Sequence, residues 1–445
     1  MMQTGLLKRI NKVYIVSGIL LYLILFFYWK FPLSPYNALI LVTFTAFSAV
    51  VYRSLTINEE KLTSRRLAIT VFVFSFVFVA LYLLISYYYT GNTFIFSEQD
   101  ARIYEELSYK IKDMPNKDII YYLTVIEDLE YDDLGAPIVM SYLMKIVPSK
   151  EFINLFFIIL NTISAWMLFS IGRSLMSKRY AYTASLAYSI SSYTIFFMGS
   201  FLKEILLLFL VIACIFCLYR HKSTKHTRNI VLGLVMSALL FFFRPAVTFG
   251  LWLAYLVYYL FVEKRRVLVI FFSVFGILII YLAFRLIVEN YYRYSTGGES
   301  VNVTSSFFNR LVFILGGLIG PFPHLLQTGD EITFKPLYGP GLMYKLFLFF
   351  AFWKGVFYSF KKRDHDVLPM IAYVVLESLG LIIAMDSLEL RKALPHFPFF
   401  LLVAFWWIDK YDKSRGGMFK KTDSLWFIIY TAASIFIILG WNILN

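Results

Sequence analysis

Long, almost uninterrupted apolar runs follow one another along this chain, and they constrain its fold more than any other feature. A helix needs roughly 20 mostly apolar residues to cross the hydrocarbon core of a bilayer. Runs of this length recur too often for one soluble core to bury them all. Only 16% of the residues are charged, whereas a soluble domain carries about a quarter. The sequence therefore predicts an all-α polytopic membrane protein.

The apolar runs predict about thirteen transmembrane helices in a single transmembrane domain covering residues 1–445. The predicted spans are 13–30, 36–53, 67–89, 151–172, 180–199, 203–219, 229–245, 247–262, 267–288, 341–360, 367–385, 395–409 and 424–443. The first span lacks a small-residue cleavage site, so we expect it to be retained. Residues 91–150 and 290–340 are more polar and are expected to form two large outer loops.

Lys and Arg residues cluster in alternate connections between the predicted spans. The clusters lie at residues 8–12, 61–66, 173–179, 220–228, 264–266, 361–363 and 410–421. Because basic connections stay in the cytoplasm, this pattern predicts a cytoplasmic amino terminus and an outer carboxyl terminus. The same bias accounts for the net charge of +14, so we expect no binding to nucleic acid.

The first outer loop is acidic and contains amphipathic segments. Apolar residues recur at helical spacing in 101–111 and in 137–147, which predicts helices lying along the membrane surface. The acidic cluster Asp128–Asp133 is interpreted as a solvated loop. Elsewhere, Cys214 and Cys217 lie in an apolar run and are interpreted as small core residues, not as a redox pair.

Polar residues inside spans or at their ends are costly, so they are candidate functional residues. Those that the predicted topology places on the outer side are Glu98, Asp100, Lys203, Glu204, Arg244, Arg310, His324, Arg391, Lys392 and His396. A carboxylate at such a position can accept a proton from a hydroxyl group. Nearby cations can stabilise a phosphate leaving group. We find no Walker motif and no dinucleotide fingerprint, so no nucleotide site is expected.

Several of these candidates also have simple structural interpretations. Asp100 precedes the predicted helix 101–111, where Asp is a good N-cap. Glu204 could pair with Lys203 or favour the helix amino end. Arg244 could extend to the membrane interface. Both His324 and His396 are more often structural than catalytic in such positions.

Several short motifs resemble those of the polytopic glycosyltransferases of the GT-C superfamily, in particular relatives of protein O-mannosyltransferases and of the lipid A aminoarabinose transferase. The carboxylate motif of their first outer loop is similar to Glu98-Gln99-Asp100, which leads into a helix. Further similar elements are Gly135-Ala136-Pro137-Ile138, Lys203-Glu204, Arg244-Pro245 and Arg391-Lys392-Ala393-Leu394-Pro395-His396-Phe397-Pro398. The chain departs from the family in having two spans more before the first motif, and in having Lys392 where Tyr is usual.

The resemblance implies a glycosyltransferase of a bacterial plasma membrane. It would move a sugar from a polyprenyl-phosphate donor to a surface glycan or lipid acceptor on the non-cytoplasmic face. Asp100 would be the catalytic base and Glu98 the second candidate, while Arg391 and Arg244 would contact the lipid phosphate. No residue is assigned as a metal ligand, although outer carboxylates can hold Mg²⁺ or Mn²⁺.

Two other functions stay open. A polymerase or ligase of lipid-linked capsular or O-antigen units would depend on basic residues such as Arg244, Arg293 and Arg310. A transporter or lipid flippase is less favoured, because the chain has no clear internal repeat and the charges noted above lie at span ends.

Overall fold

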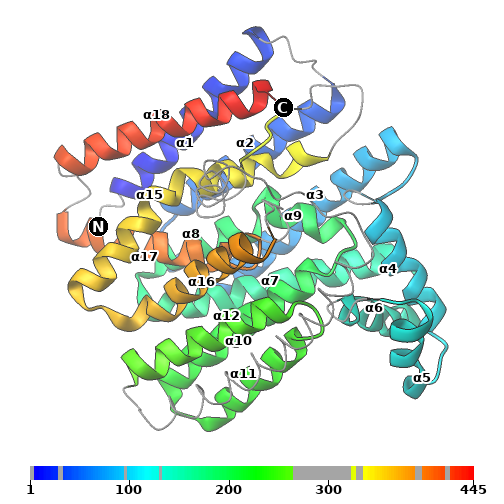
Figure 1. Cartoon of the computed structure of the whole chain (residues 1–445). Coiled ribbons are helices and arrows are strands. Elements are labelled where there is room, and N and C mark those ends of the chain that lie inside the picture. Colours follow the sequence, from blue (N-terminus) through cyan, green and yellow to red (C-terminus); the bar gives the residue numbers. More distant parts are fainter. Residues whose placement is uncertain are drawn as a thin grey trace.

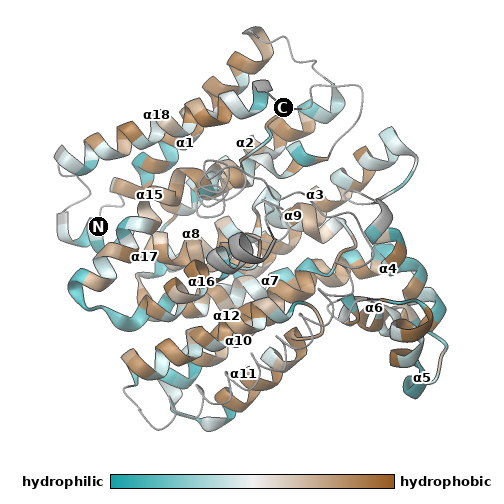
Figure 2. Ribbon diagram, in the orientation of Figure 1, coloured by the Kyte–Doolittle hydropathy of each residue, from teal (hydrophilic) through white to brown (hydrophobic). Residues whose placement is uncertain are grey.

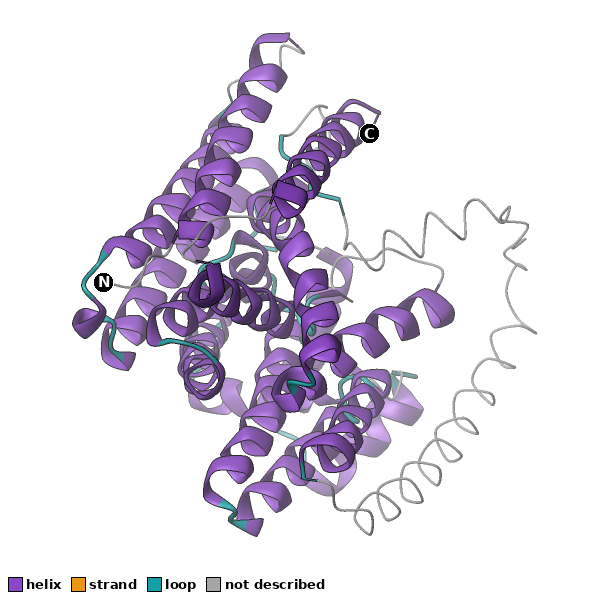
Figure 3. Cartoon of the chain, turned by 90° about the vertical axis from the view of Figure 1, so that its left-hand side faces the viewer, coloured by secondary structure: helices purple, strands orange, loops and turns teal. Residues whose placement is uncertain are grey.

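The computed structural model describes residues 5–28, 34–94, 98–129, 133–263, 322–326, 334–385, 393–415 and 421–444. All regular elements within these ranges are helices (Figures 1 and 3). Seven of the described helices are long and apolar enough to cross a membrane. The predicted all-α class is confirmed, and the apolar helices fit a multi-pass membrane protein (Figure 2).

The first helices begin and end at residues with known capping preferences. They are α1 (Gly5–Leu23), extended by the π-helical turn η1 (Ile24–Tyr28), then α2 (Pro35–Thr56), η2 (Glu59–Lys61) and α3 (Ser64–Thr90). The Ser34 side chain accepts a hydrogen bond from the backbone N–H of Asn37 at 3.2 Å and thereby caps α2. Helix α3 ends at Gly91, whose φ of 71° is a left-handed conformation that glycine adopts freely.

A small helical unit follows α3 and lies to one side of the bundle (Figure 1). It contains α4 (Glu98–Ile111), α5 (Asn116–Tyr121), η3 (Tyr122–Ile126) and α6 (Gly135–Ile146). Helices α4 and α6 match the two helices predicted from the apolar spacing of 101–111 and 137–147, whereas α5 and η3 were not predicted. The unit has an apolar core of its own, formed by Leu107, Ile111, Ile119, Leu123 and Leu134.

The predicted span 180–199 is wrong as a single helix. After α7 (Lys150–Leu175), this stretch forms α8 (Lys178–Ser189) and α9 (Ser192–Gly199), both buried. Polar groups satisfy the backbone where the helix breaks. The Asn161 amide donates to the Ser189 carbonyl at 2.9 Å, and the Thr194 hydroxyl donates to the Tyr188 carbonyl at 2.9 Å. The apolar sequence concealed this break because Ser and Thr fit equally well inside a helix of a bundle.

The remaining described helices lie within a few residues of predicted spans. They are α10 (Glu204–Thr224), α11 (Thr227–Leu240), α12 (Pro245–Val257), η5 (Tyr258–Val262), η6 (Lys335–Tyr338), α15 (Gly339–Lys362), η7 (His365–Val367), α16 (Leu368–Met385), α17 (Phe397–Arg415) and α18 (Lys421–Leu444). The predicted span 267–288 and most of the predicted loop 290–340 lie outside the described residues.

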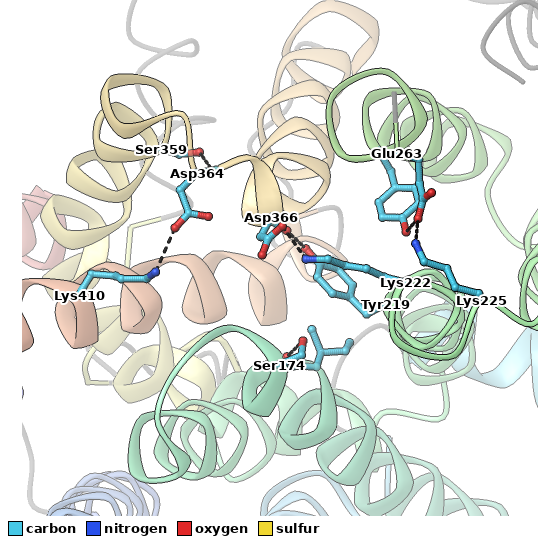
Figure 4. Close-up of polar contacts among 11 residues, drawn as sticks. Ser174, Tyr219, Lys222, Lys225, Glu263, Ser359, Asp364, Asp366 and Lys410 are labelled. Carbon is cyan, nitrogen blue, oxygen red and sulfur yellow. Dashed lines mark hydrogen bonds and ion pairs between the residues drawn. The ribbon is translucent and has the colours of Figure 1, made fainter. Parts of the chain in front are cut away.

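Connections that carry the predicted cytoplasmic basic clusters meet at one end of the bundle, which we call the basic end. There Lys222 pairs with Asp366 at 2.5 Å, and Lys410 pairs with Asp364 at 3.1 Å (Figure 4). Farther along the same end, the Asp412 carboxylate accepts a hydrogen bond from the backbone N–H of Leu6 at 3.0 Å. These contacts join turns that are far apart in sequence.

Replacing Gly341 by alanine is expected to destabilise the bundle by about 2 kcal/mol, because α15 packs directly on the break between α8 and α9. A Cβ atom at this position would lie 2.2 Å from the Ser191 Oγ and 2.8 Å from the backbone nitrogen of Tyr193. Thermal unfolding of the full chain in detergent would measure the effect. Gly440→Ala is the matched control, since a Cβ there has no neighbour within 4 Å; an equal loss in both variants would contradict the packing argument.

Candidate functional site

Most of the described candidate residues gather at the end of the bundle opposite the basic end, which we call the loop end. The α4–α6 unit lies at this end, next to the residues that precede α10 and α12 (Figure 1). The backbone N–H of Gly135 in α6 donates to the Phe242 carbonyl at 3.0 Å, which joins the helical unit to the turn before α12. The loop-end connections therefore bring four sequence-distant segments together.

Asp100 lies in the first turn of α4 and is partly exposed. Because α4 begins at Glu98, Asp100 is inside the helix and not at the N-cap that the sequence suggested. A carboxylate in this turn is stabilised by the positive end of the helix dipole. Its negative charge also acts on the Tyr104 hydroxyl one turn later. The side chain of Glu98 lies outside what the structure describes.

Asp133 contributes to the site, so its interpretation as part of a solvated loop is wrong. The Lys203 ammonium donates to its carboxylate at 2.5 Å, and the Tyr104 hydroxyl donates to the same oxygen. Burial raises the pKa of the Asp133 carboxyl, but the charge of Lys203 and the two hydrogen bonds outweigh burial and hold the pKa below its ordinary value. Asp133 therefore stays ionised and binds the helical unit to the start of α10.

Lys203 and Glu204 do not pair with each other. Lys203 pairs with Asp133, whereas the buried Glu204 carboxylate lies 3.5 Å from the guanidinium of Arg244. Arg244 is only 8% exposed, so it does not extend to the membrane interface. The turn before Lys203 contains Phe201, a buried residue with φ 58°. This left-handed backbone conformation is energetically unfavourable for a residue with a bulky side chain. Strained residues of this kind are found most often at functional sites.

His396 lies beside two buried charged residues that the sequence analysis missed. Its Nδ1 is 3.1 Å from the Glu377 carboxylate, and its Nε2 is 3.0 Å from the Lys345 ammonium. A carboxylate only accepts and an ammonium only donates, so ionised Glu377 and Lys345 would require a neutral His396 with its proton on Nδ1. Charged residues inside the apolar runs 341–360 and 367–385 were the signal that could have identified Lys345 and Glu377.

Electrostatic interactions connect these groups into one cluster. The charge of Arg244 acts on both Asp133 and Glu377, and the charges of Glu377, Glu204 and Arg244 all act on the buried Tyr193 hydroxyl. We define the buried polar cluster as Asp133, Tyr193, Lys203, Glu204, Arg244, Lys345, Glu377 and His396. It extends from the α4–α6 unit at the loop end into the bundle, and it contains acidic, basic and hydroxyl groups.

His324 lies outside this cluster and has a structural role. Its Nε2 accepts a hydrogen bond from the Trp441 indole at 3.0 Å, and the neighbouring Leu325 N–H donates to Asn442 at 2.7 Å. These contacts attach residues 322–326 to the end of α18. Burial and the charge of Lys335 lower the pKa of His324 from 6.5 to about 4.

Acidification is therefore expected to destabilise the α18 contact. The unfolded chain takes up a proton at His324 below pH 6.5, whereas the folded chain does so only near pH 4. Stability is lost as the pH falls between these values. The thermal midpoint of the full chain at about pH 7 and about pH 5 would measure this loss. His324→Gln should weaken the pH dependence, and an unchanged dependence would contradict the assignment.

The remaining candidate residues either lie outside the described residues or are buried in the core. Arg310, Arg391 and Lys392 lie outside the described residues. Cys214 and Cys217 are free and buried. Among the described residues, no group of three or more His, Cys, Asp or Glu side chains is placed to hold a metal ion.

No protein-family model, curated protein or solved structure matches the chain.

Proposed function

We propose that this protein is a glycosyltransferase that moves a sugar from a polyprenyl-phosphate donor to a glycan or lipid acceptor. It would cross a bacterial plasma membrane about thirteen times, with the basic end in the cytoplasm and the loop end outside. The observation that carries the proposal is the buried polar cluster, where the carboxylate of Asp133 and the cations Lys203 and Arg244 meet next to Asp100 on α4. Carboxylates that can accept a proton and cations that can stabilise a phosphate, placed at one membrane face, suit the transfer of a sugar from a lipid phosphate.

The proposed step is a direct displacement. The acceptor hydroxyl oxygen forms a bond to the anomeric carbon of the donor, and the bond from that carbon to the phosphate oxygen breaks. The hydroxyl proton passes to the Asp100 carboxylate, and the electron pair of the broken bond stays on the polyprenyl phosphate. Lys203 and Arg244 stabilise the negative charge that develops on the leaving phosphate. Arg391 and Lys392, which follow α16, are further proposed phosphate contacts.

Asp133 is a poor candidate for the base. A general base works best when its pKa lies near the working pH. The pKa of Asp133 is held below its ordinary value by Lys203 and by hydrogen bonds, so its carboxylate is a weak base. Asp100 is partly exposed and close to the Tyr104 hydroxyl, where an acceptor can approach it. Asp133 is accordingly a positioning residue.

Transport of a lipid-linked glycan is a second candidate, because Lys345 and Glu377 are charged residues buried in the interior of α15 and α16. Charged residues inside a bundle often mark the path of a substrate or an ion. Lys345 and Glu377 lie inside helices and not at span ends, so the position of the charges no longer disfavours transport. Polymerisation or ligation of lipid-linked units would use the same cations as the proposed transferase and is distinguished by its product.

Mass spectrometry of lipid-linked and surface glycans tests the proposal. Cells carrying the wild type, a deletion or Asp100→Asn at matched expression would be compared. The transferase requires that both mutants accumulate a polyprenyl-phosphate monosaccharide and lose one sugar from a surface acceptor. Accumulation of a complete repeat unit with loss of polymer would indicate the polymerase or ligase. Unchanged glycans in the deletion would contradict both and leave transport.

A further inference from the structure

Several polar atoms of the buried polar cluster lack a hydrogen-bond partner within the described part of the chain. They are the Glu204 Oε2, the Arg244 Nη1 and the Glu377 Oε1, and the Tyr338 hydroxyl next to the cluster shares this property. All four side chains are at least nine-tenths buried. An unsatisfied buried polar group destabilises a fold, and native proteins contain few of them. Several together indicate a place that a polar ligand completes.

The side chains that carry these atoms interact electrostatically with Tyr193. The charges of Glu377, Glu204 and Arg244 act on its hydroxyl, and so does the neighbouring Tyr338. The Tyr193 ring lies 6.3 Å from the ring of Tyr338 and 5.5 Å from that of Phe397. The cluster therefore includes packed aromatic rings as well as charged groups.

The chemistry of the unsatisfied atoms restricts the ligand. The two carboxylates, Glu204 and Glu377, would repel a phosphate, and the cations Arg244 and Lys345 would repel a simple cation. Two acidic and two basic side chains balance in charge, whether Glu377 and Lys345 are both ionised or both neutral, so an uncharged ligand fits best. A sugar ring offers several hydroxyl groups that can donate to carboxylate oxygens and accept from a guanidinium. Its C–H faces can pack against aromatic rings.

We propose that Glu204, Arg244 and Glu377 form the subsite for the sugar ring of the donor, with Tyr338 contributing its hydroxyl. This inference rests on the proposed function, and it places the sugar deeper in the bundle than the phosphate, which Lys203 contacts nearer to the loop end. His396 and Lys345 are positioning residues. The His396 Nδ1 contacts the Glu377 Oε2 at 3.1 Å, whereas the Oε1 and the hydroxyl of Tyr373, which neighbours Glu377, have no hydrogen-bond partner within the described residues.

Kinetics of the full chain in nanodiscs can separate recognition of the sugar from recognition of the phosphate. The substrate is the lipid-linked sugar that accumulates in deletion cells, and polyprenyl phosphate without a sugar serves as the competing inhibitor. Glu377→Gln and Tyr338→Phe are each expected to raise KM for the lipid-linked sugar by about tenfold, because each removes or weakens one hydrogen bond to it. Inhibition by polyprenyl phosphate should change by less than about twofold, since no contact with the phosphate is lost.

Matched substitutions elsewhere control for the chemical change itself. Tyr22→Phe removes another buried hydroxyl without a described partner, in α1, and Glu263→Gln neutralises a carboxylate at the basic end. Both should keep the wild-type KM. Tyr338→Phe should also keep the wild-type thermal midpoint, because its hydroxyl makes no described hydrogen bond that the substitution would remove.

The outcomes distinguish this inference from the proposed function. If the deletion accumulates no lipid-linked sugar, both are overturned. If transfer occurs but Glu377→Gln and Tyr338→Phe keep the wild-type KM, the sugar subsite alone is overturned, and the unsatisfied atoms bind only water. If both variants weaken inhibition by polyprenyl phosphate as strongly as they raise KM, the cluster binds phosphate and not the sugar ring.

Discussion

Replacing Arg244 by glutamine is expected to lower the rate of sugar transfer by about a thousandfold. Arg244 is buried, and its charge acts both on Asp133, near the proposed phosphate position, and on Glu377 in the proposed sugar subsite. Its Nη1 has no hydrogen-bond partner within the described residues, so it is available to a substrate oxygen. Glutamine removes the positive charge and cannot reproduce the planar set of donors. Transfer of labelled sugar by the purified full chain would measure the loss.

The same substitution should also reduce stability, and this second effect must be separated from the first. Without Arg244, the Glu204 carboxylate stays buried and loses its nearest described cation, at 3.5 Å. Removing one partner of a buried ion pair costs about 3 kcal/mol, because the other charge stays desolvated. The double variant Arg244→Gln, Glu204→Gln removes both charges and should recover most of the thermal midpoint.

The rate of sugar transfer by the double variant shows whether Arg244 acts on the substrate or only balances the charge of Glu204. If activity stays low while stability returns, Arg244 acts on the substrate. If activity returns together with stability, the residue only balances the charge of Glu204, and the proposed contact is wrong. For Arg244→Lys we expect a rate of sugar transfer between those of the wild type and Arg244→Gln. An ammonium keeps the positive charge but lacks the planar geometry of the guanidinium.

The helices could be predicted from the sequence because lipid imposes a simple rule on composition. A run such as Ser64–Thr90 has few other stable conformations in a bilayer, so its length and hydropathy determine its structure. Positions of candidate residues along the chain followed in the same way. Lys203 and Arg244 lie at helix boundaries, directly before α10 and α12.

The pairing of those residues could not be predicted, because it depends on how helices pack and not on composition. Lys203 is adjacent to Glu204 in sequence, but it pairs with Asp133, which is 70 residues away. Glu377 was overlooked because a single carboxylate hardly changes the hydropathy of α16. Its contact with His396 appears only when α16 and α17 pack together. The break between α8 and α9 similarly depends on Asn161, a residue of another helix.

Asp100→Asn and Asp133→Asn are the same chemical change at two carboxylates of the loop end, but we expect them to have different effects. Asp100→Asn should lower kcat by about a thousandfold and leave KM and the thermal midpoint near their wild-type values, because it removes only the proposed base. Asp133→Asn should instead lower the thermal midpoint and raise KM. It removes the charge that pairs with Lys203, whose side chain is only 6% exposed.

The contrast follows from where the two carboxylates lie. Asp133 is the described residue through which Tyr104 of α4 and Lys203 are joined, so its loss loosens the helical unit and leaves an ammonium buried without its partner carboxylate. Breaking this pair should cost about 2 kcal/mol, less than for a fully buried pair because the Asp133 side chain is 27% exposed. Adding Lys203→Met to Asp133→Asn should therefore restore stability without restoring phosphate contact. A loss of kcat at unchanged KM in Asp133→Asn, with Asp100→Asn fully active, would exchange the two roles and make Asp133 the base.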